Sequence, residues 1–194
     1  MQRIYLFILF LLNLSVIYAS INLLKDSSFE ERTDILKNWF PFLSGFYLSN
    51  ERPYDGSQSI EITPSDGSYG LFQITQINYS TPNTKNSCNV MMLGGYARTE
   101  WQYQLDALFS LKLNFEDEEI KIKDVDLTFQ RGVHDWNHAC KIIFLPKGIE
   151  KLKSALLYII AYKTGENYGT IWFDDVVLKH HHFEKEDGKK KKKI

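Results

Sequence analysis

The sequence predicts an all-β fold, an antiparallel β-sandwich or barrel built from short strands. The clearest signal lies in residues 105–115, where apolar residues occupy every second position and mostly polar residues stand between them. Shorter runs of this kind recur at 70–77, 90–98, 125–129, 141–145, 156–162 and 170–178. Segments rich in Gly, Pro, Asn, Asp and Ser separate the runs, as turns do between strands. At least seven short strands with almost no helical periodicity favour a sandwich or a barrel.

The chain is long enough for one domain with a sizeable core. It has 194 residues, of which 44% are hydrophobic and 14% aromatic. We expect the domain to span residues 21–179, after a signal peptide at 1–20 and before a disordered tail at 180–194. This tail is rich in His and Lys and of low complexity, so it cannot bury apolar surface. Its three histidines are too few to indicate a metal site.

The first 20 residues have the layout of a cleaved secretory signal peptide. Arg3 supplies the basic start, residues 4–18 are apolar apart from Asn13 and Ser15, and Ala19 and Ser20 are small. A retained membrane anchor is the alternative, but the apolar stretch is shorter than the roughly 20 residues that span a bilayer. We therefore expect a secreted, extracellular protein without a stable membrane span.

The charge of the domain argues against one class of partner. The formal net charge of the chain is −1, and because the tail is basic, the domain itself is acidic and has no basic stripe. Nucleic acid attracts proteins through its phosphates, which need Lys and Arg on the protein surface. We expect no nucleic-acid partner. The five consecutive lysines of the tail fit either anionic lipid or polysaccharide, or a solvated terminus without a partner.

Two features fit export. Cys88 and Cys140 both lie in the part expected to leave the cytosol, where thiols can oxidise. We favour one disulfide between them; the alternative is two buried thiols that fill core positions. Asn78 opens the sequence Asn-Tyr-Ser, an acceptor for N-glycosylation in the secretory pathway.

Several short segments follow the order typical of one family. In sequence order they are "NLLKDSSFEE" (22–31), Trp39, "YDGSQSIEI" (54–62), "GLFQITQI" (70–77), "GGYAR" (94–98), "HDW" (134–136) and "GTIWFDDVVL" (169–178). In these segments the chain resembles carbohydrate-binding modules with the galactose-binding-like jelly-roll fold, and the resemblance covers residues 22–178. It implies a jelly-roll β-sandwich of about eight or nine strands that binds glycan.

The resemblance also implies a structural calcium ion. In such modules a calcium ion often sits between the first and last strands, held by carboxylates and backbone carbonyls. Carried onto this chain, the ligands are the carboxylates of Glu30 and Asp174 and the backbone oxygen of Ser28. Calcium accepts six to eight oxygen ligands of both kinds. The alternative is that Asp174 pairs with a lysine or caps backbone amides, while Asp175 faces water.

A sugar site is expected near one strand. Sugars stack on aromatic rings and accept hydrogen bonds from planar polar groups, and alternation places Tyr96 and Arg98 on one face of the run 90–98. Trp101 and Tyr103 follow at the end of this strand, where a loop aromatic can close over a ligand. His134 lies in a turn and either contacts the ligand or caps the next strand. The alternative for Tyr96 and Arg98 is cross-strand pairing.

No catalytic set is recognisable in the sequence. No Ser or Cys stands in a nucleophile elbow, and no pair of carboxylates is placed to face across a cleft. We therefore expect a secreted, non-catalytic module whose partner is a glycan or glycoprotein. Two alternatives remain: a protein-interaction or adhesion ectodomain on the same fold, and a detached targeting module of a larger glycoside hydrolase.

Overall fold

The protein forms a two-layer β-sandwich. The structure is a computed structural model, and it describes residues 21–31, 37–43, 46–64, 68–80, 87–100, 105–115, 124–145, 151–163 and 169–184. In this part of the chain the strands are β1 (Phe40–Phe42), β2 (Phe46–Ser49), β3 (Ser59–Ile62), β4 (Ser68–Ser80), β5 (Ser87–Glu100), β6 (Leu105–Phe115), β7 (Val125–Thr128), β8 (His134–Phe144), β9 (Lys151–Lys163) and β10 (Thr170–Glu184).

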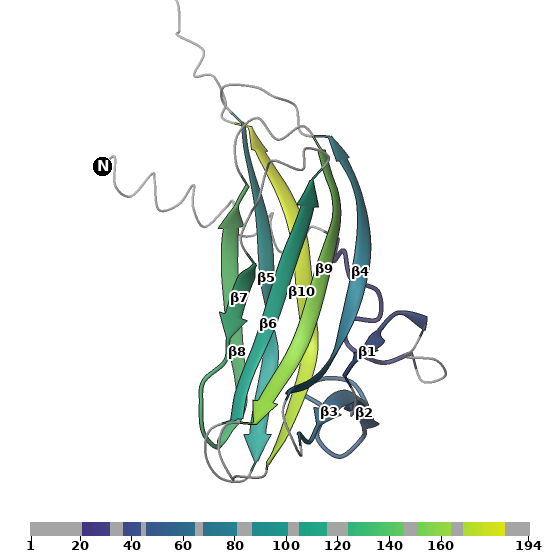
Figure 1. Cartoon of the computed structure of the whole chain (residues 1–194), viewed down its shortest axis with the longest axis vertical. Coiled ribbons are helices and arrows are strands. Elements are labelled where there is room, and N and C mark those ends of the chain that lie inside the picture. The colour runs from purple at the N-terminus through teal and green to yellow at the C-terminus, as the bar shows by residue number, and fades with distance from the viewer. Residues whose placement is uncertain are drawn as a thin grey trace, which may run out of the picture.

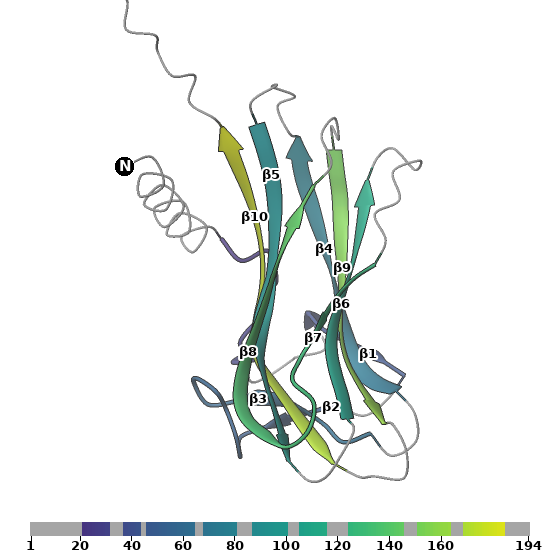
Figure 2. The ribbon, with the colours of Figure 1, turned by 90° about the vertical axis from the view of Figure 1, so that its left-hand side faces the viewer.

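The ten strands form two antiparallel sheets of five. Sheet A has the order β2-β3-β10-β5-β8 and sheet B the order β1-β4-β9-β6-β7. The sheets face each other, with sheet B in front in Figure 1 and at the right in Figure 2. The expected all-β sandwich is confirmed, with ten strands in place of eight or nine. The described residues contain no helix long and apolar enough to cross a membrane.

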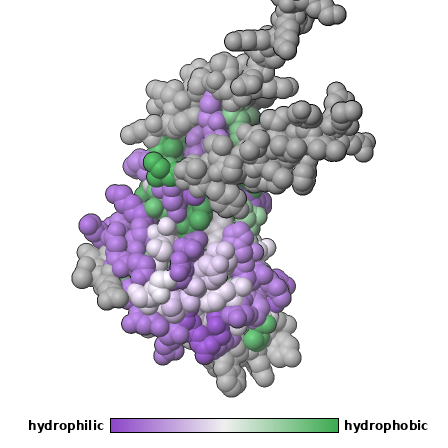
Figure 3. All heavy atoms as spheres, turned by 180° about the vertical axis from the view of Figure 1, so that it is seen from behind, coloured by the Kyte–Doolittle hydropathy of each residue, from purple (hydrophilic) through white to green (hydrophobic). Residues whose placement is uncertain are grey.

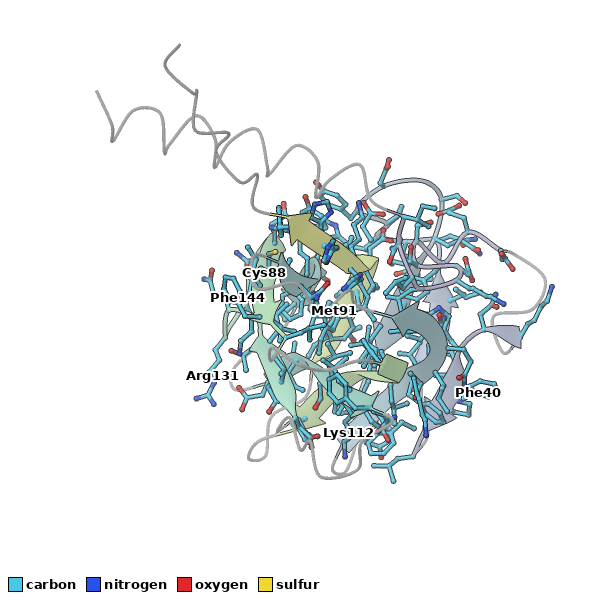
Figure 4. The ribbon with its side chains drawn as sticks, turned by 90° about the horizontal axis from the view of Figure 1, so that it is seen from above. Phe40, Cys88, Met91, Lys112, Arg131 and Phe144 are labelled. Carbon is cyan, nitrogen blue, oxygen red and sulfur yellow. The ribbon has the colours of Figure 1, made fainter. Side chains whose placement is uncertain are left out.

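The core fills the space between the sheets. Phe109 of β6, Phe173 of β10 and Phe129 lie within 6 Å of one another by ring centroid, with separations of 4.9, 5.7 and 5.9 Å. Seen end-on, Met91 lies between the sheets, whereas other labelled side chains lie at the periphery (Figure 4). The alternation of apolar and polar residues therefore places one face of each sheet in the core between the sheets.

Residues 22–25 tie the two sheets together. Asn22 forms an antiparallel bridge with Lys179 of β10. Further along, the Lys25 amide donates to Gln73 Oε1 of β4 (2.8 Å), and Gln73 Nε2 donates to the Lys25 carbonyl (2.9 Å). This exchange satisfies a buried amide side chain that would be costly without partners. The N-terminal segment thus links β10 of sheet A to β4 of sheet B.

The predicted start of the tail is wrong by five residues. Strand β10 continues to Glu184, and its histidines 180–182 pair with β5. The register explains this continuation, since residues 179–184 pair in unbroken order with residues 92–87 of β5. Residues 185–194, like the predicted signal peptide at 1–20, lie outside the described residues.

The predicted disulfide is also wrong. Both cysteines are free, Cys88 half-buried and Cys140 exposed, so neither fills the core. Cys140 of β8 lies opposite Gly94 of β5, six residues along that strand from Cys88. Six residues of strand span about 20 Å, far more than the roughly 7 Å limit between bridged Cα atoms. An intramolecular bridge is therefore excluded by the strand register.

Candidate functional site

Five consecutive backbone amides of the loop 54–58 donate hydrogen bonds to carboxylates. Asp174 Oδ2 accepts the amides of residues 54 and 55 (2.9 and 3.3 Å). Glu30 Oε1 accepts those of residues 57 and 58 (2.7 and 2.9 Å), and Asp55 accepts the one between them (2.9 Å). The Asp174 carboxylate in the last strand therefore holds this loop against sheet A. Asp174 caps backbone amides, which is what the alternative to calcium binding predicts.

A β-bulge aims the Asp174 carboxylate at the loop. The register of β10 against β5 shifts between Asp174 and Val177, and Asp175 has a φ of 49°, which bends the strand. The Asp175 amide donates to Asp174 Oδ1 at 2.7 Å. The side chain of Asp174 is completely buried, and this burial raises its pKa to about 6, against the lowering effect of the amides.

Carboxylates gather around the predicted calcium ligands Glu30 and Asp174, although every carboxylate oxygen of these two residues already accepts a hydrogen bond from the protein. Burial also raises the pKa of Asp26 and Asp175, and no Lys or Arg of the described residues forms an ion pair with either of them or with Asp174. Asp26 Oδ2 is buried without a hydrogen-bond partner. The described residues hold no cluster of three His, Cys, Asp or Glu side chains, so backbone oxygens such as that of Ser28 would have to complete the shell.

The predicted sugar-site tyrosine is covered by another tyrosine. The Tyr54 ring stacks on Tyr96, with centroids 3.6 Å apart and planes 16° apart. Trp136 meets the Tyr54 ring edge-on at 5.8 Å, and His138 lies 4.8 Å from Tyr96. We call these four residues the sheet A cluster. A ligand on this face meets Tyr54, which is 41% exposed, before it meets Tyr96.

Ion pairs engage the charged groups beside the sheet A cluster. Arg98 contacts Glu100 (3.0 Å) and Asp135 (3.1 Å), and Arg52 forms a second ion pair with Glu100. Seen from behind, the lower half of this face is mostly pale to purple, which marks weakly to strongly hydrophilic residues (Figure 3). Any ligand of Arg98 therefore competes with two carboxylates of the protein.

Of the other predicted sugar-site residues, His134 lies in the described part of the chain and does not join this cluster. His134 begins β8, where its ring nitrogens contact the backbone oxygens of Asp135 (2.7 Å) and Gln130 (2.8 Å), which is the capping alternative. Trp101 and Tyr103 lie outside the described residues. Asn78 lies in β4, within the register shift between Gln76 and Tyr79.

Sheet B carries an aromatic row that the sequence analysis missed. Phe40 of β1 lies opposite Phe72 of β4, and Phe72 lies opposite Tyr158 of β9. Neighbouring ring centroids in this row are 5.6 Å apart in both cases. Phe40 is 45% exposed, and Ile74, two residues beyond Phe72 on the same face, is 51% exposed. In the aromatic row (Phe40, Phe72, Tyr158), Phe40 is therefore exposed, whereas Phe72 and Tyr158 are half-buried, and Phe42 meets the Tyr158 ring edge-on at 5.1 Å.

Polar groups flank the aromatic row. Lys112 lies 5.8 Å from the centre of the Tyr158 ring. About 13 Å further along the strands, Gln76 pairs with Ser154, and Asn114 Nδ2 donates to Ser154 Oγ (3.0 Å). The two amide side chains are exposed. Sheet B thus presents aromatic rings and planar amides on one face.

One signal in the sequence could have located the aromatic row. The run "ALLYIIAY" (155–162) is apolar or aromatic at every position, whereas a strand with one face in water should alternate. Tyr158 and its neighbours two residues away point outward, because residues 157, 159 and 161 are buried. A continuous apolar run therefore indicated a second, outward apolar face on β9.

Comparisons with known proteins establish the fold. Neither a family model nor a curated protein matches the sequence. Among solved structures, the chain is similar to a family 16 carbohydrate-binding module (TM-score 0.57, 15% identity, covering 81% of this chain and 99% of that one). It is also similar to the CBM22-2 xylan-binding domain of Paenibacillus barcinonensis Xyn10C (0.57, 11%, 80% and 98%). These likenesses confirm the jelly-roll fold of carbohydrate-binding modules.

Other neighbours on this fold have other roles. The chain is similar to the enzymatically active domain of a bacteriophage CBA120 tailspike protein (TM-score 0.60, 15% identity), of which it spans only 22% while 83% of this chain is covered. A cyclase from Fischerella sp. also matches (0.54, 14%, 84% of this chain and 97% of that one). Because such different proteins share the fold, the function has to be inferred from the surface residues.

Proposed function

We propose that the protein is a secreted, non-catalytic module that binds glycan through the outer face of sheet B. The observation that carries this proposal is the aromatic row, whose rings lie side by side across three strands on the outer face of sheet B, with Phe40 exposed. Aromatic faces stack on the apolar side of a pyranose ring, and ligand sites combine such faces with a few polar groups. The amides of Gln76 and Asn114 supply hydrogen bonds on the same face.

The sheet A cluster is the rival surface for the same function. It has an exposed Tyr54 ring, and beside it lies Arg98, whose buried Nε lacks a hydrogen-bond partner. The carboxylates and guanidinium groups beside the cluster, however, already pair with one another. Breaking these pairs would cost part of the binding energy, so we assign the glycan to sheet B.

Binding measurements on matched variants test the assignment. A glycan array identifies a ligand, and calorimetry then compares the wild type with Tyr158→Ala on sheet B and Tyr54→Ala on sheet A. We expect Tyr158→Ala to weaken binding at least about tenfold, equivalent to 1.4 kcal/mol, and Tyr54→Ala to change it less than about twofold. The reverse order would move the site to sheet A. Silence across the array would favour the protein-interaction alternative.

Secretion, glycosylation at Asn78 and calcium binding belong to the same proposal. Expression in a eukaryotic secretory host should release protein that lacks roughly its first 20 residues and carries glycan on Asn78. Peptide mass spectrometry of the medium checks both. A membrane-bound product that retains Met1 would contradict the proposed export. Calcium binding at Glu30 and Asp174 is tested separately, by removing calcium with a chelator and measuring the melting temperature.

A further inference from the structure

Strand β8 is unlike the other strands at the sheet edges. In the described part of the chain, β1, β2 and β7 have three or four residues, whereas β8 has eleven. The open side of an edge strand presents unpaired N–H and C=O groups, which can template another strand. Proteins usually keep such edges short or guard them with lysine or proline. The length of β8 therefore needs an explanation.

Strand β8 also lacks these guards. It contains no proline and a single lysine, Lys141, whose Nζ donates to the backbone oxygen of Asp126 (2.9 Å). Its one acidic residue, Asp135, balances this lysine, so two copies of the strand would not repel each other. The charges of β8 thus allow it to pair with a second copy of the same strand.

Exposed apolar side chains accompany the open edge. Phe144 is 71% exposed and Ile142 is 40% exposed. They lie opposite Val90 and Met92 of β5, which are buried, so the exposed apolar strip lies on β8 itself. Figure 4 shows Phe144 at the periphery of the molecule, away from the core. Such a strip beside an unpaired edge is typical of an interaction surface.

We propose that β8 pairs antiparallel with β8 of a second copy of this chain, about a two-fold axis at Cys140. This arrangement is independent of the glycan site. Opposite residues then lie equally far from Cys140 on either side: Trp136 faces Phe144, and His138 faces Ile142. Each exposed apolar side chain gains a ring of the second copy, and Lys141 faces Ala139 rather than a like charge. The contact is the same patch on both subunits, as a two-fold interface requires.

The size of the interface predicts a weak dimer. Eleven residues of strand extend about 36 Å, and one strand pair buries less than the roughly 1,200 Å² of a standard stable interface. The dissociation constant should therefore lie in the micromolar range. Sedimentation velocity between about 5 and 200 µM brackets that range.

Two variants distinguish this specific interface from nonspecific association. We expect wild-type protein to sediment as a dimer at the upper concentrations and Ile142→Lys to stay monomeric, since lysine guards an edge. Tyr47→Lys is the matched control, because Tyr47 is 65% exposed on the other edge strand of sheet A, and it should still dimerise. A monomeric wild type at 200 µM, or equal dissociation in both variants, overturns the proposal.

The cysteine at the axis allows the register to be tested in the wild-type protein. Residues directly opposite in an antiparallel pair have Cα atoms about 4.5 to 5.5 Å apart, within disulfide range. Added glutathione disulfide should therefore join the two Cys140 thiols: one S–S bond forms between the subunits, and the glutathione is reduced to two thiols that take up the two protons. We expect a covalent dimer in wild type and in Cys88→Ser, and none in Cys140→Ser. A dimer linked through Cys88 overturns the proposed pairing.

Discussion

The outer faces of the two sheets differ in what their side chains already contact. On sheet A, the loop 54–58 covers part of the face and the charged groups pair among themselves. On sheet B, the aromatic row is exposed at Phe40 and Ile74 lies open beside it. Both faces carry aromatic and polar residues, so composition does not separate them. The contacts within the protein decide which face can accept a ligand.

The largest contrast between the two sheets should come from one glycine in each. A Cβ at Gly70 of sheet B would lie 2.0 Å from the Ile159 carbonyl oxygen, whereas at Gly94 of sheet A the nearest atom, the Ala139 oxygen, is 3.1 Å away. We expect Gly70→Ala to lower the free energy of unfolding by about 3 kcal/mol or more, and Gly94→Ala by less than about 1 kcal/mol. Urea denaturation measures both. Equal losses would mean that the strands of sheet B separate more easily than their register implies.

A smaller effect is expected from removing calcium on the sheet A side. A cation bound only by the folded state stabilises it by about 2.7 kcal/mol at a hundredfold excess over Kd. We expect chelation to lower the melting temperature of the wild type. Asp174→Asn should abolish this response, and Asp175→Asn should leave most of it. A melting curve that chelator does not move would show that the amides of the loop 54–58 satisfy the carboxylates alone.

The pH dependence of stability should show a further, smaller difference. Burial raises the pKa of Asp174 to about 6 in the folded protein, above the ordinary value of 3.8 for an aspartate. Its stabilising contribution is therefore complete below about pH 4 and is lost as the pH rises through 6. In chelator, the stability of the wild type relative to Asp174→Asn should fall between pH 4 and 6. A rise over that interval in urea denaturation would mean that hydrogen bonds from the amides outweigh burial.

The sequence predicted the strands better than the surfaces. Period-two alternation located most strands, because it reports directly which side chains face the core. Composition misplaced the tail, since His180 and its neighbours were judged by charge although they continue β10. The sequence did not show which strands pair with one another or in which register. Phe40, Phe72 and Tyr158 come together only through the register of three strands, and the same register keeps the cysteines apart.

An isoleucine methyl NMR titration tests most directly whether the glycan lies on sheet B. Among the described residues, each outer face has one exposed isoleucine: Ile74 beside the aromatic row is 51% exposed, and Ile142 on sheet A is 40% exposed. We expect addition of the glycan identified on the array to shift the Ile74 methyl signal in a saturable way. The Ile142 signal should stay in place at constant protein concentration. A saturable shift of Ile142 with an unmoved Ile74 would contradict the assignment of the ligand to sheet B.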